Sequence, residues 1–197
     1  MSVAKVRRKL DRHGLLLVTD PVLPSVAGIV AREPVQGSWW SHPASHAIFR
    51  VLERLDDAGN TLLVKLVSGK QTFVAETLWR DFFSVVTAKE RWQTEGLSRE
   101  DRSLLRRVES GDRVHSAKGA KMLETRLLVH GKNVHTESGA HAKVLTSWKV
   151  CMQDLHFRFR AEDPEASKTV FEERLDAWAS EFGKKATLPW RKRGNLH

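Results

Sequence analysis

The chain has 197 residues, which suits one domain or two small ones, and its 41% hydrophobic and 29% charged residues exclude a disordered chain. Its one cysteine, Cys151, excludes an internal disulfide and a cysteine-based zinc site. Because no apolar run is long enough for a bilayer span or a signal peptide, we expect a cytoplasmic protein without a membrane partner.

The net charge of +9 is concentrated in three stretches of the sequence. Residues 1–13 carry a net charge of +4, residues 184–197 carry +5, and residues 102–150 hold ten lysines and arginines against four acidic residues. If the fold brings these stretches together, they form a surface that faces a polyanion. The pattern predicts a nucleic acid partner, with DNA favoured over RNA; the alternative is solvated helix faces and a soluble tail.

The first half of the chain is predicted to form helices and one β-hairpin. Apolar residues at helical spacing predict helices over 2–18, 23–31, 43–59 and 77–88. Before the last of these, two β-rich runs flank Ser68-Gly69, a dipeptide that fits a two-residue hairpin turn. Such a turn pairs Val64 with Phe73 and Lys65 with Thr72.

The second half is predicted to alternate helices with short strands. Ser98, followed by acidic residues, is typical of a helix start. After this helix the pattern predicts, in order, a strand over 112–116, a helix over 118–129, a strand over 132–137, and helices over 139–152 and 164–183.

Together these elements predict an α+β fold that is mostly helical, with a β-hairpin and a winged-helix-like second half. The expected parts are a helical and hairpin subdomain over 1–92, a winged-helix-like subdomain over 93–160, a C-terminal helix over 161–183 and a basic tail over 184–197.

The order helix, strand, basic helix, strand across 98–137 resembles a winged helix-turn-helix module, in which the second helix enters the major groove and the wing touches phosphate. The resemblance makes 118–129 the reading helix, with Thr125 among its exposed residues and Asn133 on the wing. An ordinary helix pair with solvated charges is the alternative. The predicted nucleic-acid-binding residues are Lys65, Lys70, Arg113, Lys118, Lys121, Arg126, Lys132, Trp190, Arg191, Lys192 and Arg193.

The segments GSWWSHP, KLVSGKQTFV and VHTESGAHAKVLTSW resemble those of small bacterial proteins. More distantly, the chain from about Leu15 to Trp148 resembles the winged-helix DNA glycosylases of the AlkZ type, which remove alkylated bases. The resemblance implies a winged-helix fold and a role in DNA repair. That family activates water with a Gln-x-Asp or Gln-x-Gln pair, and this sequence contains neither.

The segment HTESGAH, residues 135–141, is the densest cluster of groups that can do chemistry. Glu137, His135 and His141 are the candidate catalytic residues, as general acid or base. The alternative is a strand-to-helix turn in which Thr136 or Ser138 caps a helix. The H-x-E of zinc deaminases is matched, but their P-C-x-x-C is absent, which excludes that class.

A tryptophan pair, Trp39 and Trp40, and a histidine pair, His42 and His46, lie around the start of the helix predicted over 43–59. For Trp39 and Trp40, packing of both rings in the core is the main expectation; the alternative leaves one ring exposed to stack on an unpaired base. His42 and His46 lack the H-E-x-x-H pattern, so we interpret them as helix caps and expect no metal and no cofactor. The lone indole of Trp190 stacks on a base or docks onto the domain.

The favoured function is DNA binding, linked to DNA repair or base recognition. The first alternative is a nucleic-acid-acting hydrolase or glycosylase that uses Glu137 with His135 or His141. The second is a protein-interaction or assembly module in which the acidic helix over 165–182 holds a partner or a second copy of the chain. The oligomeric state is left open.

Overall fold

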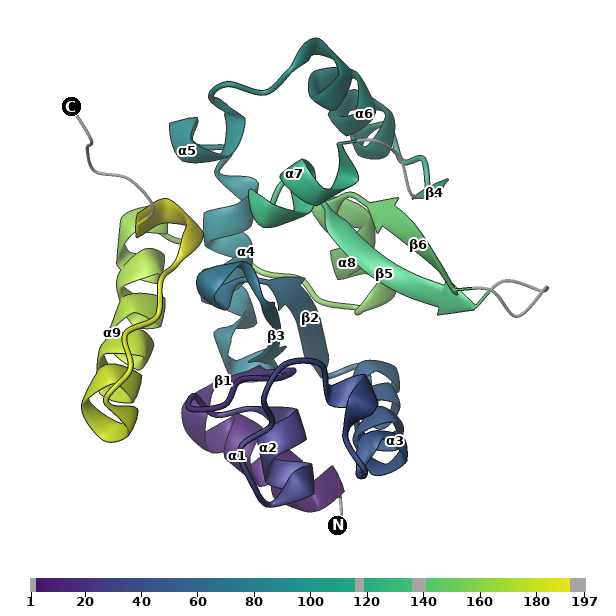
Figure 1. Ribbon diagram of the computed structural model, residues 1–197. Coiled ribbons are helices and arrows are strands. Elements are labelled where there is room, and N and C mark those ends of the chain that lie inside the picture. The colour runs from purple at the N-terminus through teal and green to yellow at the C-terminus, as the bar shows by residue number, and fades with distance from the viewer. Residues whose placement is uncertain (1–2, 116–118, 136–140, 192–197) are drawn as a thin grey trace.

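The computed structural model describes residues 3–115, 119–135 and 141–191, with the backbone alone for 133–135, 141 and 142. Within these residues the chain forms two three-stranded antiparallel sheets surrounded by helices (Figure 1). The predicted α+β class is confirmed. No helix in the described ranges is both long and apolar enough to cross a membrane.

The first sheet lies at the centre of the molecule, between two layers of helices (Figure 1). Its strand order is β1-β3-β2, with bounds Leu15–Leu17, Gln71–Ala75 and Thr61–Lys65. One face, which includes Leu16 and Phe73, packs on the helices α1 (Val3–His13), α2 (Val26–Ala31) and α3 (Ser45–Asp57). The other face packs on α4 (Trp79–Thr87) and α9 (Pro164–Phe182). Because successive strand residues point to opposite faces, one short sheet supports two separate cores.

The predicted helix over 2–18 is wrong in its second part. The helix α1 ends at His13, and Gly14 takes a φ of +73°, a conformation that glycine adopts without strain. Residues Leu15–Leu17 then form the edge strand β1, and all three side chains are fully buried. Leu16 packs in the core beside α1 to α3, and Leu15 and Leu17 pack in the core on the other face of the sheet. Helical periodicity in the sequence does not reveal that these residues pair with β3.

The hairpin is confirmed in position, but its predicted register is wrong by one residue. Val64 lies opposite Thr72, and Leu63 lies opposite Phe73. The connection is a 3-10 turn over Val67–Gly69 rather than a two-residue turn, with both Ser68 and Gly69 at positive φ. The shift places Val64 in the core beside α4 and Phe73 in the core beside α1 to α3, so each strand buries both of its faces.

The second sheet has the strand order β4-β6-β5 and is covered by two helices. After the short helix α5 (Arg91–Thr94), the capped helix α6 (Arg99–Glu109) begins at Ser98 as predicted. The other elements are β4 (Val114–His115), α7 (Ala120–Thr125), β5 (His130–His135), β6 (His141–Thr146) and α8 (Trp148–Asp154).

Two predicted helices of this half differ from the structure. The helix over 118–129 shortens to α7, because Leu127 takes a positive φ and Leu127, Leu128 and Val129 turn into the core. The helix over 139–152 is a strand, β6, followed by α8, whose N-terminus is capped by Ser147. The strand β4 lies between α6 and α7 in sequence, and the winged-helix-like character of this half stays a prediction.

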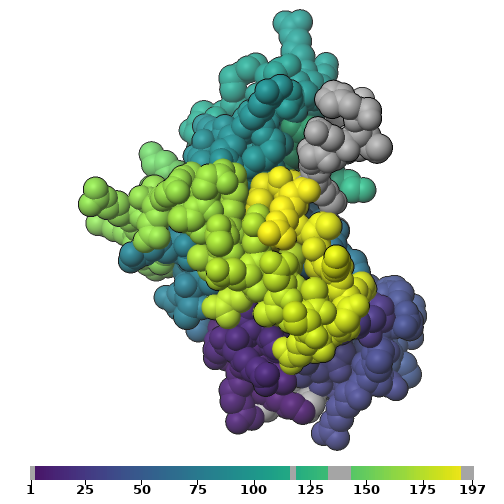
Figure 2. Space-filling model, turned by 90° about the vertical axis from the view of Figure 1, so that its left-hand side faces the viewer, coloured from purple at the N-terminus to yellow at the C-terminus, as the bar shows by residue number. Residues whose placement is uncertain are grey.

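The C-terminal part folds back onto the first sheet. The helix α9 agrees with the predicted helix over 164–183, and the structure adds Asp163 as its N-terminal cap and Gly183 as its C-terminal cap. Residues 184–191 then return along it, with Leu188 fully buried and Thr187 hydrogen-bonded to Ser68 through both main-chain groups. Figure 2 shows α9 and this segment side by side on one face of the molecule. The expected basic tail over 184–197 is therefore docked as far as its described residues extend.

Candidate ligand-binding cleft

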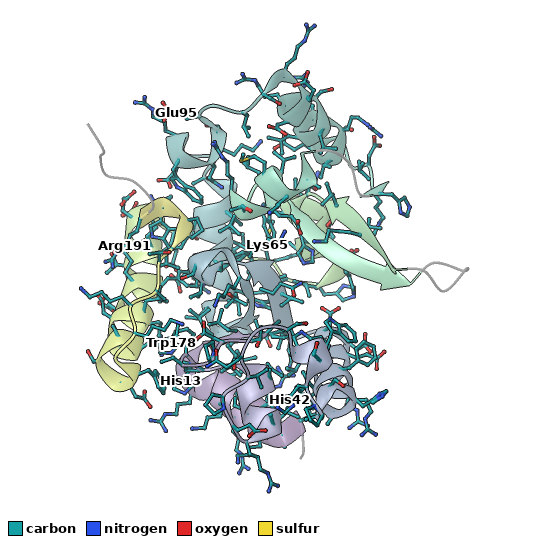
Figure 3. The ribbon with its side chains drawn as sticks, viewed as in Figure 1. His13, His42, Lys65, Glu95, Trp178 and Arg191 are labelled. Atoms are coloured by element: carbon teal, nitrogen blue, oxygen red, sulfur yellow. The ribbon has the colours of Figure 1, made fainter. Side chains whose placement is uncertain are left out.

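Of the seven predicted nucleic-acid-binding cations that the structure describes, five are held by carboxylates or carbonyls of the chain itself. Lys65 and Lys143 donate to the two oxygens of Glu124 at 2.7 and 2.8 Å, and the Glu124 side chain is only 8% exposed. Lys65 lies near the middle of the molecule, on β2 beneath α7 (Figure 3). This ion triad ties α7 to β2 and β6, so Lys65 has a structural role.

Lys70 is paired in a similar way with Asp20. The Asp20 carboxylate is 1% exposed and accepts hydrogen bonds from Lys70 at 2.7 Å and Lys184 at 2.9 Å. Burial favours a raised pKa for Asp20, but these bonds and two from the backbone N–H groups of Leu23 and Val22 outweigh it and hold the pKa well below its usual range. Asp20 therefore fixes the C-terminal segment to the first sheet.

The remaining predicted contacts are paired within the chain, exposed to solvent, or outside the described residues. Arg113 pairs with Asp154 through two bonds of 2.9 and 3.0 Å, and Arg126 donates to the carbonyls of Gln93 and Glu95. The indole of Trp190 and the guanidinium of Arg191 both donate to Glu172, so Trp190 docks onto the domain. Lys121 and Lys132 are exposed. Lys118, Lys192 and Arg193 lie outside the described residues.

The described residues of the basic stretches do not combine into the single surface that the charge pattern predicted. The helix α1 lies at one end of the molecule and α6 at the other, with α7 between α6 and the first sheet (Figure 1). Four carboxylates of α9, including Glu172 and Glu181, pair with cations of the chain itself. The acidic helix thus binds its own C-terminal segment and α1.

The two tryptophans are not in the core, and the expectation that both pack there is wrong. They lie in the 3-10 turn η1 (Trp39–Ser41), where the backbone lets adjacent side chains share one side. Their rings stack with centroids 4.0 Å apart and planes inclined by 24°. Trp39 leans on the core beside α3, and Trp40 is 60% exposed and contacts Phe49 at a centroid distance of 5.8 Å. An indole pair with one free face is the alternative that the sequence left open.

These rings form one wall of a cavity of about 300 Å³, here called the aromatic cleft. Its other walls come from α3, the first sheet and β5. It is lined by Val18, Trp39, Trp40, Phe49, Leu52, Glu53, Asp56, Asp57, Leu63, Gln71, Phe73 and Lys132. A cavity of this size and composition, apolar with a few polar groups, is typical of a small-molecule or side-group binding site.

Two further cavities adjoin the aromatic cleft. Val18, Trp39 and Gln71 also line a cavity of about 380 Å³ that reaches Asp20 and Lys70. Asp56, Leu63 and Lys132 also line one of about 270 Å³ that reaches His130 and Cys151. The three neighbouring cavities are here called the groove.

The titratable groups of the groove differ in what they can do. Burial raises the pKa of the half-buried Asp56 above its ordinary value; Lys132 opposes this rise and Asp57 adds to it. Burial, with Lys132 nearby, lowers the pKa of His130 to about 4, so the ring is neutral at physiological pH. Burial raises the pKa of Cys151 to about 12, so its thiol is not a nucleophile. Asp56 is therefore the acid–base candidate of the groove.

None of the three candidate catalytic residues from the sequence has a side chain that the structure describes. Glu137 lies outside the described residues, and His135 and His141 are placed by backbone alone, opposite each other in the β5–β6 pair. His42 accepts a hydrogen bond from the Ala44 N–H at 3.1 Å and meets Glu33 at 3.1 Å, but α3 begins without a side-chain cap and His46 is exposed, so the predicted caps are wrong. Among the described residues no group of three metal-ligating side chains converges.

Sequence reasoning missed Asp56, Gln71 and Phe49 as cleft residues. In the sequence Asp56 looks like one more charge at a helix end, and Phe49 looks like part of the buried face of α3. They become cleft residues only because α3, the tryptophan turn, the first sheet and Lys132 of β5 line one cavity, which is a long-range arrangement. The one local signal was the Trp pair itself.

Comparison of the chain with protein-family models, curated proteins and solved structures found no match.

Proposed function

We propose that this protein binds nucleic acid and takes an unpaired base into the aromatic cleft, where the base stacks on Trp40. The observation that carries the proposal is the stacked indole pair, because an indole that is 60% exposed and already backed by a second ring is a rigid platform for a third flat ring. The amide of Gln71 and the carboxyl of Asp56 lie in the same cleft and offer hydrogen bonds to the edge of a base.

The charge of the cleft supports a base rather than a phosphate at this position. Its lining includes three carboxylates, Glu53, Asp56 and Asp57, against one ammonium, Lys132. Phosphate groups are repelled by such a lining, whereas the face of a base tolerates it. The sugar–phosphate backbone must then lie outside the cleft, over cations elsewhere on the surface.

The test compares Trp40→Ala with Trp40→Phe and with Met122→Ala, an exposed apolar control on α7. Loss of one stacked base weakens binding of a labelled single-stranded oligonucleotide by about 1–3 kcal/mol, or roughly 5- to 150-fold. Fluorescence anisotropy should show this loss for Trp40→Ala, a partial loss for Trp40→Phe and none for Met122→Ala. Equal affinities for all three variants and the wild type would refute base stacking.

A second candidate function, an enzyme that acts on nucleic acid, is favoured by Asp56. A carboxyl with a raised pKa, half-buried in a cavity beside an aromatic platform, is suited to general acid–base catalysis. The test is hydrolysis of duplexes that carry damaged bases, with Asp56→Asn against Glu173→Gln, an exposed control on α9 outside the cleft. Activity that Asp56→Asn abolishes and Glu173→Gln retains supports the enzyme. Activity that both variants retain contradicts the role of Asp56.

A further inference from the structure

The segment after α8 presents two arginines and a histidine that the sequence analysis did not single out. In HFRFR, residues 156–160, His156, Arg158 and Arg160 are exposed, while Phe157 and Phe159 between them are half-buried. The phenylalanines pack on Phe83 with centroid distances of 5.5 and 5.9 Å. The core therefore anchors every second residue and leaves the alternate residues in solvent.

The spacing of this row follows from the extended backbone. The ring centroids of Phe157 and Phe159 lie 6.0 Å apart with planes inclined by 19°, as expected for alternate residues of an extended chain, which rises about 3.3 Å per residue. Arg158 and Arg160 on the opposite side have the same periodicity. Successive phosphates along an extended nucleic acid strand have a similar spacing.

The acidic residues that lie near this row in sequence are occupied elsewhere. Asp154 is held by Arg113, Glu162 by Arg80, and Asp163 caps α9. Lys149, Arg158 and Arg160 are here called the basic strip. Among the described residues no carboxylate pairs with any of these three side chains, whereas Lys65, Lys70 and Arg191 each have a carboxylate partner. Lys149 and Arg158 line one hollow together with His156. The basic strip thus has positive charge that the described fold does not neutralise.

The backbone of the same segment also has donors to offer. The N–H of Phe157 bonds to Met152 and that of Glu162 bonds to Ser84. Within the described part of the chain, the four N–H groups between them have no hydrogen-bond acceptor. Exposed backbone N–H groups beside arginines are common contacts of phosphate oxygens.

We infer that the basic strip binds the phosphate backbone of a nucleic acid strand. This inference rests on the proposed function and supplies the phosphate contacts that the acidic lining of the aromatic cleft cannot provide. The helix α8 connects the two sites: Cys151 and Asp154 line the groove on one side of it, and Lys149 and Gln153 line the hollow on the other. A helix is about 10–12 Å across, so one strand can pass over α8 from the basic strip to the groove.

The test measures affinity against salt concentration for the wild type and for the double variant Arg158→Gln/Arg160→Gln. The matched control is Arg99→Gln/Arg102→Gln, which removes two exposed arginines of α6 that have no carboxylate partner among the described residues. The probes are a labelled single strand and a fully paired duplex of mixed sequence. Thermal unfolding of both variants shows whether they keep the fold.

Two lost phosphate contacts should lower the slope of log affinity against log salt by about 2 for the duplex, and the control should keep the wild-type slope. An unchanged slope in the strip variant, or an equal change in the control, overturns the inference. Tight binding of polyglutamate in place of the oligonucleotides also overturns it. A strip variant with normal binding beside a defective Trp40→Ala refutes the strip alone, whereas a wild type that binds neither probe refutes the proposed function as well.

Discussion

Replacement of Glu124 by alanine tests whether Lys65 and Lys143 are structural rather than free to bind phosphate. The carboxylate is 8% exposed and contacts the two ammonium groups at 2.7 and 2.8 Å. Removal of one partner of a fully buried ion pair costs about 3–5 kcal/mol. The two lysine side chains are 21% and 25% exposed, so water partly solvates them, and we expect a loss of about 2–3 kcal/mol.

Urea denaturation followed by circular dichroism measures this loss, and Glu173→Ala, an exposed residue of α9, serves as the control with a change within about 0.5 kcal/mol. In a chain of this length the loss corresponds to a decrease in Tm of about 4–12 °C. The triple variant Lys65→Met/Glu124→Leu/Lys143→Met should recover most of the stability, because it leaves no charge unpaired. A loss for Glu124→Ala no larger than that of the control would refute the reasoning and make both lysines candidates for phosphate contact again.

Three further predictions concern the fold. Gly14→Ala should destabilise the protein by about 1–2 kcal/mol, measured by urea denaturation, because Gly14 has a φ of +73° and a Cβ there meets Leu78 at 2.7 Å; Gly59→Ala, at positive φ in open space, should cost less. The wild type should lose stability as the pH falls from about 6.5 toward 4, because the lowered pKa of His130 keeps the ring neutral in the folded protein while the ring of the unfolded chain protonates. The free energy of unfolding of His130→Gln, measured against pH, should lack this part of the pH dependence. Identical profiles for the variant and the wild type would contradict the prediction. Ser98→Ala should cost about 1 kcal/mol through loss of the α6 cap, with Ser103→Ala on the same helix as the control in thermal unfolding.

The sequence predicted those elements whose signals are local. Asp163-Pro164 and Gly183 mark the two ends of α9, and Ser98 marks the start of α6; each of these signals acts within one turn of its own helix. The strands β1 and β6 were missed because their apolar residues fit a helical stripe equally well. Pairing with β3 makes residues 15–17 a strand, and pairing with β4 and β5 makes residues 141–146 a strand.

The sequence singled out the aromatic pair of the candidate site, with an exposed ring only as the alternative to core packing, and it did not predict the charges of the site. Lys65, Lys70 and Arg113 look like free cations in sequence, and each has a carboxylate partner at least forty positions away. Conversely, Arg158 and Arg160 lie in a segment with net negative charge, yet the acidic residues around them are paired with Arg113 and Arg80. Charge counts along a sequence cannot assign these ion pairs, because the partners come together only in the folded chain.

The central claim, that an unpaired base enters the aromatic cleft, is tested most directly by comparing a duplex with one bulged nucleotide and the same duplex fully paired. The account predicts that the wild type binds the bulged duplex more tightly and that Trp40→Ala binds both equally, because the variant loses the platform on which the extra base stacks. Equal affinity of the wild type for the two duplexes would contradict the account.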